Sequence, residues 1–409
     1  MKVFRCFLIF LLVLSMFPAF AGDKKINDSV TQADVCIGPE IVTINLTRAD
    51  SGVTLLDENK NSMTVRMDIG SIEFLPVTTR EGKFILPRID TFSRSFRVGE
   101  PTLPIASRLI SIPFDCSLKV EVKDTTSQDI DLKAYDLVDP FMPVQPSLSK
   151  SQHPDTVPFE YNRSLYASGG KYALDLAAVE ILGTLRSMRL GRIAISPIEY
   201  YANDNKIKVY TSVTLRIKYK NPNWDKTEKI KKKLKSPAFD GLNNLVLNGS
   251  ASAQTLAQED DLVKYPIKYA IVADRMFESQ LAPFIQWKTK KGFTVVVGYT
   301  DTIGSTTSAI KTWLQNLYNA GTTEDPAPSF VLLVGDVQQI PAWSGSAGSH
   351  ITDLRYCEFT GDNFPEIYYG RFSAQKRAIS RASFLSVFVR IMDAEPKALI
   401  CAGLTMLTV

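Results

Sequence analysis

The chain has 409 residues, of which 45% are hydrophobic and 22% are charged, and its formal net charge is +4. This composition excludes a largely disordered chain, and the length predicts about two domains plus a segment that is removed. Because much of the basic excess is concentrated within residues 226–235 rather than spread over a face, the charge does not indicate nucleic-acid binding.

Residues 1–21 have the pattern of a secretory signal peptide. Two basic residues precede an apolar stretch at residues 7–17, and Ala19-Phe20-Ala21 forms a small-x-small cleavage site. The alternative is an N-terminal membrane anchor, but the apolar stretch is shorter than the roughly 20 residues that a spanning helix needs. We therefore expect export, a mature chain that begins at Gly22, and no membrane span after the signal is removed.

Residues 22–220 are predicted to form an all-β sandwich. Apolar and polar residues alternate within 108–122 and 206–220, which is typical of strands that are buried on one face. Turn signals such as Gly169-Gly170 separate short strands, and this spacing favours antiparallel sheets that pack face to face.

Residues 221–262 are predicted to be a linker, because the composition changes there from basic to small and polar. A lysine-rich linker that is exposed is a place where a precursor is processed, since flexible loops present their backbone to proteases. A solvated basic run with no processing role is the alternative, and the sequence leaves both open.

From Lys268 the hydrophobic period changes to one of alternating strands and helices. Strands are expected at residues 269–273, 294–299 and 330–334, and helices at residues 277–291 and 305–320. Residues 303–305 are expected to supply a helix N-cap, and Gly292 and Gly321 are expected to end helices. Such alternation predicts a parallel sheet with right-handed crossovers, hence a Rossmann-like three-layer α/β unit over residues 263–375.

The stretch 329–372 carries the candidate ligand-binding residues. A buried parallel strand ends just before Asp336, and the open ends of such strands are where α/β proteins place ligand groups. Asp362 and Glu366 lie around a proline turn ahead of another strand at 367–372, so several oxygen ligands are expected to converge near Asp336. Oxygen ligands of this kind indicate a hard cation.

Residues 265–373 resemble the N-terminal part of the catalytic domain of the gingipain-type cysteine peptidases, which have a caspase-like fold. The resemblance is carried by Trp287-Lys288 with Gly292, Gly335-Asp336, Ile340-Pro341 and Gly370-Arg371-Phe372. The segment 97–113, RVGEPTLPIASRLISIP, resembles the propeptide of the same peptidases, which has a G-x-P-x-L-P stretch before a strand. The fold class is therefore multidomain α+β, a β-sandwich propeptide followed by a caspase-like α/β unit.

The resemblance implies a secreted bacterial cysteine endopeptidase precursor, periplasmic or at the cell surface. The propeptide would pack on its own catalytic domain, and proteins or peptides would be the substrates of the completed enzyme. The family's catalytic His and Cys are expected beyond the matched residues, and the final stretch 376–409 departs from the family. The chain as given is therefore predicted to be inactive. The alternative function is a non-catalytic secreted binding module or chaperone-like propeptide protein.

The cysteines offer one internal candidate for nucleophilic catalysis. Such catalysis needs a thiolate within hydrogen-bond reach of an imidazole, and Cys357 with His350, oriented by Asp353, is the pair considered. The alternative is a semi-buried thiol beside a loop histidine. The other cysteines are too scattered for a disulfide framework, although a Cys36–Cys116 disulfide stays open.

The resemblance also implies a structural calcium ion. Its ligands would be the side chains of Asp336, Asp362 and Glu366 and the main-chain carbonyls of Thr360 and Phe364. Phe359 is the alternative carbonyl donor, because the loop is one residue shorter than in the relatives. Without calcium, Asp336 would only cap the next turn and the other two carboxylates would be solvated.

Overall fold

The computed structural model describes residues 36–37, 41–153, 156–168, 170–249, 266–346 and 350–376. The predicted signal peptide, the second part of the predicted linker and the predicted tail from residue 377 onward lie outside the described residues. Within these ranges, no helix combines the length and the apolar character that crossing a membrane requires.

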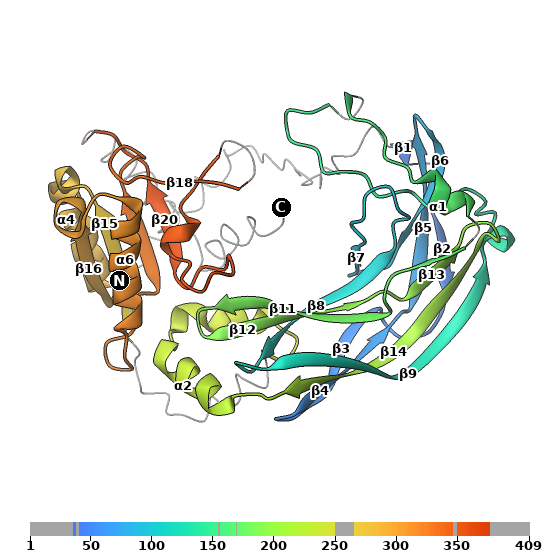
Figure 1. Ribbon diagram of the computed structural model, residues 1–409, viewed down its shortest axis with the longest axis horizontal. Helices are drawn as coiled ribbons and strands as arrows, with labels where there is room; N and C mark the ends of the chain where they lie inside the picture. The colour runs from blue at the N-terminus through green and yellow to red at the C-terminus, as the bar shows by residue number, and fades with distance from the viewer. Residues whose placement is uncertain are drawn as a thin grey trace, which may run out of the picture.

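Three antiparallel sheets occupy the first half of the described chain (Figure 1). The first contains β1 (Cys36–Ile37), β2 (Val42–Asn45), β5 (Ser71–Thr79) and β6 (Gly82–Arg88). The second contains β3 (Gly52–Glu58), β4 (Ser62–Asp68), β9 (Ser117–Asp131), β10 (Lys171–Ala173), β13 (Ile198–Tyr201) and β14 (Lys206–Lys220). The third contains β7 (Ser93–Arg94), β8 (Pro104–Ile112), β11 (Ala177–Leu185) and β12 (Met188–Ile195). Two short helices, η1 (Leu132–Tyr135) and α1 (Arg163–Ala167), lie in the same half of the chain.

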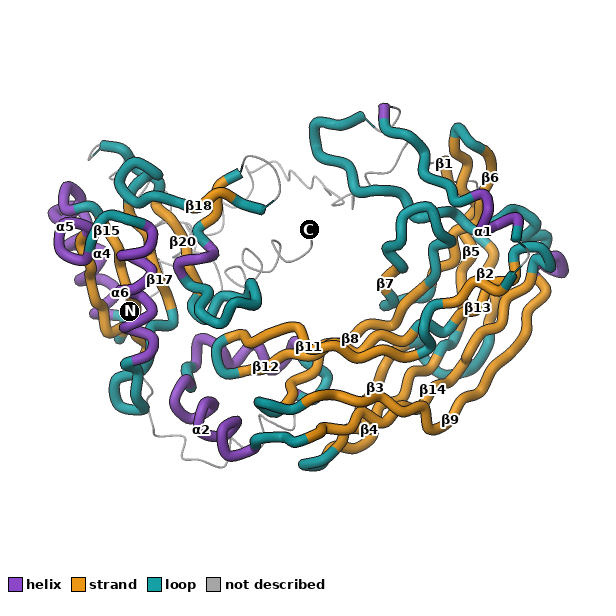
Figure 2. Tube along the Cα trace, in the orientation of Figure 1, coloured by secondary structure: helices purple, strands orange, loops and turns teal. Residues whose placement is uncertain are grey.

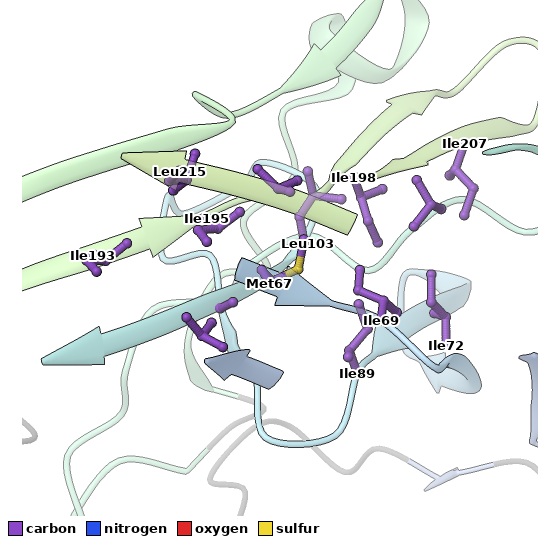
Figure 3. Close-up of a cluster of buried hydrophobic side chains, with 14 of the residues drawn as sticks. Met67, Ile69, Ile72, Ile89, Leu103, Ile193, Ile195, Ile198, Ile207 and Leu215 are labelled. Carbon is purple, nitrogen blue, oxygen red and sulfur yellow. The ribbon is translucent and has the colours of Figure 1, made fainter. Parts of the chain in front are cut away.

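One apolar core is shared by these sheets. Met67, Ile195 and Leu215 come from three different strands and meet in it (Figure 3). Along β14, every second residue is buried, as the alternation at 206–220 predicts. The alternation at 108–122 is instead divided between β8 and β9, because Pro113 has no N–H to donate and Asp115 has a φ of 60°.

A four-stranded parallel sheet forms the second half, in the order β16 (Phe293–Tyr299), β15 (Ile267–Ala273), β17 (Phe330–Val334) and β20 (Tyr368–Phe372). The other elements of this half are η4 (Arg275–Phe277), α4 (Glu278–Lys290), α5 (Thr300–Ile303), α6 (Thr307–Asn319), β18 (Trp343–Ser344), β19 (Ile351–Thr352) and η5 (Leu354–Tyr356). The strands lie within two residues of those predicted at 269–273, 294–299, 330–334 and 367–372.

Apolar side chains cover both faces of the parallel sheet. Leu281 of α4 belongs to a cluster with Ile271 and Val334, whereas Leu314 of α6 belongs to a cluster with Val272. Neighbouring residues of one strand point to opposite faces, so α4 and α6 pack on opposite sides of the sheet. Figure 2 shows the helices on either side of the strands.

The helix ends differ from the sequence prediction at one place. The N-cap expected at residues 303–305 is wrong: Gly304, with a φ of 96°, ends the short helix α5, and the Thr306 hydroxyl caps α6 by accepting from the Ala309 N–H at 3.2 Å. The predicted ends at Gly292 and Gly321 are confirmed, since each follows the C-cap residue of its helix.

The first part of the predicted linker is folded rather than extended. It forms α2 (Trp224–Leu234) and η3 (Pro237–Leu245). The Trp224 indole donates to the Lys60 carbonyl at 2.8 Å, and the Leu234 side chain is buried in the apolar cluster of the parallel sheet. The segment therefore contacts both halves of the chain, as Figure 1 shows for α2.

Candidate active-site edge

The carboxyl ends of the parallel strands meet at one edge of the sheet, where α/β proteins bind ligands. Asp274 follows β15, and its side chain caps η4 by accepting from the Met276 N–H at 2.9 Å. Asp336 follows β17, and Ser373 follows β20. The sequence prediction that Asp336 lies at a strand end is borne out by these element bounds.

Asp336 is held by hydrogen bonds to its own edge. Its carboxylate accepts from the Gln375 amide at 2.7 Å, the Val337 N–H at 2.9 Å and the Ser373 hydroxyl at 3.0 Å. These donors, Gln375 first, lower the pKa of Asp336 from its ordinary value. The carboxylate is therefore ionised at neutral pH and joins the ends of β17 and β20.

The side chain of Arg371, on β20, lies below the surface and stabilises the same edge of the sheet. It makes a two-point ion pair with Asp353, with Nη2 2.6 Å from Oδ1 and Nε 2.7 Å from Oδ2. The guanidinium also donates to the Gly335 and Ile340 carbonyls at 2.9 and 2.8 Å. Asp353 is thus the partner of Arg371, and the structure gives it no bond to His350.

The structure does not bring Cys357 and His350 together as a catalytic pair. The Cys357 thiol is 0% exposed in the apolar cluster under α6, whereas His350 lies on an exposed loop. Burial raises the pKa of the Cys357 thiol well above its ordinary value, which disfavours the thiolate. The thiol is fully rather than semi-buried. Cys116 is also a free, buried cysteine, so no Cys36–Cys116 disulfide forms here.

The loop that follows Cys357 folds around its own carboxylates. Glu366 is 1% exposed and accepts from the Phe359 N–H at 2.6 Å and the Thr360 hydroxyl at 2.8 Å. Burial raises the pKa of Glu366 to about 7. Asp362 accepts from the Phe364 N–H at 2.9 Å and from the Thr184 N–H, on β11, at 2.5 Å.

The five residues predicted to hold calcium do not converge. β17 and β20 are parallel, with Phe330 opposite Tyr368 and Val334 opposite Phe372. Asp336 follows the end of β17 and Glu366 precedes the start of β20, so they lie at opposite edges, separated by at least the ~13 Å length of the strands. Two oxygens on one calcium ion lie within about 5 Å of each other. Among the described residues no three His, Cys, Asp or Glu side chains are grouped to hold a metal.

Thr360, Asp362 and Phe364 lie with Glu366 in one loop, at the amino edge of the sheet. Sequence reasoning missed the residue that lies beside this loop: Arg186, at the tip of the β11–β12 hairpin, donates to the Glu366 carbonyl at 3.4 Å. No local signal identifies it, because an arginine in a two-residue turn is most often solvent-exposed.

Antiparallel sheets followed by a parallel sheet, with carboxylates and an arginine at its strand ends, define a multi-unit α/β protein. Two family models match the chain in the same order: Propeptide_C25 at residues 45–245 and Peptidase family C25 at residues 263–383. The chain belongs to the gingipain-type cysteine peptidases and carries their propeptide region.

The chain is similar to proteins of the bacterium Porphyromonas gingivalis. Its Lys-gingipain is 32% identical over 333 residues, which cover 81% of this chain and 19% of the relative. Its Gingipain R2 is 25% identical over 332 residues, which cover 80% of this chain and 42% of the relative. A solved structure on the zymogenic latency of gingipain K has 30% identity and a TM-score of 0.42, and the match covers 44% of this chain and 99% of that chain. The chain thus spans a small part of the Lys-gingipain length.

Proposed function

We propose that the chain is part of a secreted, gingipain-like cysteine endopeptidase precursor. In this proposal residues 22–220 are a β-sandwich propeptide, and residues 263–375 are the first part of a caspase-like catalytic domain. The observation that carries it is the match of both regions, in order, with 32% identity to Lys-gingipain across 81% of the chain. The contacts of the β11–β12 hairpin with the second half support a propeptide that packs on its own catalytic domain.

The implied reaction is acyl transfer. A Cys thiolate attacks the carbonyl carbon of a peptide bond, and the C–N bond breaks as an imidazolium gives its proton to the leaving amine. Water then cleaves the thioester, which releases the acid and restores the thiol. In this proposal the reaction belongs to the carboxyl edge of the parallel sheet, where Arg371 and Asp353 fix the loop after β17. Two of the thiols, those of Cys357 and Cys116, are not accessible, since these residues are 0% and 3% exposed.

We therefore also propose that this chain hydrolyses no peptide bond. Its two histidines are His153 and His350. His350 is on the surface and the Cys357 thiol is in the core, and their separation supports the proposal. The same observation favours, as a second candidate for the chain as given, a secreted binding or chaperone-like propeptide protein.

The test is purified protein from Gly22 to Val409, incubated with a mixed peptide library under reducing conditions before and after limited proteolysis. We expect no turnover in either case. Turnover that both Cys357→Ala and His350→Ala abolish would contradict the proposal. Secretion is tested separately by N-terminal sequencing of exported protein, which is expected to begin at Gly22; an intact Met1 would contradict export by cleavage.

A further inference from the structure

Arg186 lies in the two-residue turn between β11 and β12, yet its side chain is fully buried. Leu185 pairs with Met188 across the turn, and the whole Arg186 residue is 1% exposed. Its φ is 56°, a left-handed conformation in which glycine or asparagine is the usual residue of such turns. An arginine that is both buried and in a disfavoured conformation persists only when its surroundings hold it there.

The surroundings of Arg186 are main-chain carbonyl oxygens. Nε donates to Leu234 at 2.7 Å, Nη1 to Pro328 at 2.8 Å and to Glu366 at 3.4 Å, and Nη2 to Ala327 at 3.2 Å. These hydrogen bonds from the guanidinium to other described residues all end on main-chain carbonyls, and none of them ends on a carboxylate. The carbonyl dipoles therefore compensate for the buried charge.

Aromatic rings complete the enclosure. The guanidinium carbon of Arg186 lies 4.6 Å from the centre of the Phe239 ring, which stacks on Tyr368 at 4.2 Å and 8°. A planar guanidinium suits such a site, because it offers five donors in a fixed fork and stacks on aromatic faces, which an ammonium group does not. Burial lowers the pKa of Arg186 to about 10, so the group is still charged at neutral pH.

These atoms come from separate parts of the chain. Leu234 and Phe239 belong to α2 and η3, whereas Ala327 and Pro328 precede β17 and Glu366 precedes β20. Both β17 and β20 belong to the parallel sheet, and their amino ends lie at the edge opposite Asp336. Two further contacts bind the same edge, from the Thr184 N–H to Asp362 and between the Ser236 and Ser329 hydroxyls at 2.8 Å.

We propose that the carbonyls of Leu234, Ala327, Pro328 and Glu366, with the Phe239 ring, form an arginine-binding socket that docks the β11–β12 hairpin on the amino edge of the parallel sheet. The ligand class is a guanidinium group, here supplied by the chain itself. Docking at this edge leaves the carboxyl edge, with Asp336, outside the contact. The proposal goes beyond the proposed function, because it concerns a contact within this chain and not its activity.

The test is chemical rescue in the protein from Gly22 to Val409. Arg186→Ala empties the socket, and hydrogen exchange is measured at the amides of Ser329 and Tyr368. The Ser329 amide donates to the Lys268 carbonyl and the Tyr368 amide to the Ser329 carbonyl, next to the socket. We expect exchange at these amides to be about tenfold faster, since several hydrogen bonds to a charged group are lost. Millimolar methylguanidinium is expected to restore protection in the variant, whereas methylammonium at equal concentration is not.

Matched variants separate docking from general instability. Arg192→Ala removes an arginine of the same hairpin whose side chain is 44% exposed, and it is expected to leave these amides unchanged. Arg186→Lys keeps the charge without the planar fork, and it is expected to lie between the wild type and Arg186→Ala; it also serves if Arg186→Ala does not fold. Unchanged exchange in Arg186→Ala and Arg186→Lys, or equal rescue by both cations, would overturn the proposal. No arm depends on peptidase activity, so the outcome is independent of the proposed function.

Discussion

Asp336 and Glu366 lie at opposite edges of one parallel sheet, although only 30 positions separate them in the sequence. Each carboxylate has its own set of donors: Ser373, Gln375 and the Val337 N–H for Asp336, and Thr360 with the Phe359 N–H for Glu366. The two groups therefore act on the stability of the chain independently.

The first prediction is additivity. Asp336→Ala and Glu366→Gln should change the free energy of unfolding by amounts that sum, to within about 0.5 kcal/mol, in the double variant, because residues more than 7–10 Å apart without shared partners do not couple. Urea denaturation of the four proteins, in calcium and in chelator, measures this. A coupling that appears only in calcium would restore the shared site predicted from the sequence.

The second prediction concerns the Cys357 thiol. Because the thiol is 0% exposed and burial raises its pKa, iodoacetamide should alkylate it at least about 100-fold more slowly in the native protein than in urea. Mass spectrometry of tryptic peptides reports each cysteine separately. Cys116, at 3% exposed, is the internal control and should be protected as well. Rapid alkylation of Cys357 alone would show an accessible thiol and reopen the catalytic pair.

Local periodicity was enough to place most elements of the fold. Alternation identified β14, and a continuous apolar run identified β17, because both patterns reflect which side chains face the core. The segment after residue 221 was predicted as a linker because its composition changes from basic to small and polar. Its Thr227, Ile230 and Leu234 recur at helical spacing and face the protein. The sequence of this segment therefore contains the pattern of an amphipathic helix among its lysines.

The candidate site depended on strand direction and register, which composition does not give. Asp336 follows its strand and Glu366 precedes the next one, so in a parallel sheet they belong to opposite edges, and this order was readable from the sequence. The position of Arg186 was not readable. Its partners are main-chain carbonyls from three distant segments, and carbonyl groups are present at every residue.

The third prediction tests whether α2 is a stable helix rather than a flexible processing segment. The Asn223 side chain caps α2 by accepting from the Lys226 N–H at 2.9 Å. Asn223→Ala should destabilise the helix by about 1 kcal/mol and make tryptic cleavage after its lysines about fivefold faster. Glu228→Gln, at a side chain 66% exposed on the same helix, is the control and should cleave at the wild-type rate. Rapid cleavage within α2 of the wild type would instead support the flexible linker.

The fourth prediction concerns Lys288 on α4, whose ammonium lies among aromatic rings. Nζ is 4.6 Å from the Tyr269 ring centre and 4.8 Å from those of Trp287 and Phe293. Burial, followed by repulsion from Lys291, lowers the pKa of Lys288 from 10.5 to about 8. Ring faces attract the ammonium and oppose this shift, so the net cost of the charge in the folded state is small.

Lys288→Met should therefore raise the free energy of unfolding at pH 7 by about 1 kcal/mol, a figure reduced for the partial exposure of the side chain. Between pH 8 and 10.5 the unfolded chain keeps the Lys288 proton and the folded chain releases it, so wild-type stability rises with pH relative to the variant and the difference shrinks. Urea denaturation at pH 7, 8 and 9 measures the trend. A Lys288→Met protein less stable than the wild type at pH 7 would mean that the rings outweigh the cost of burial.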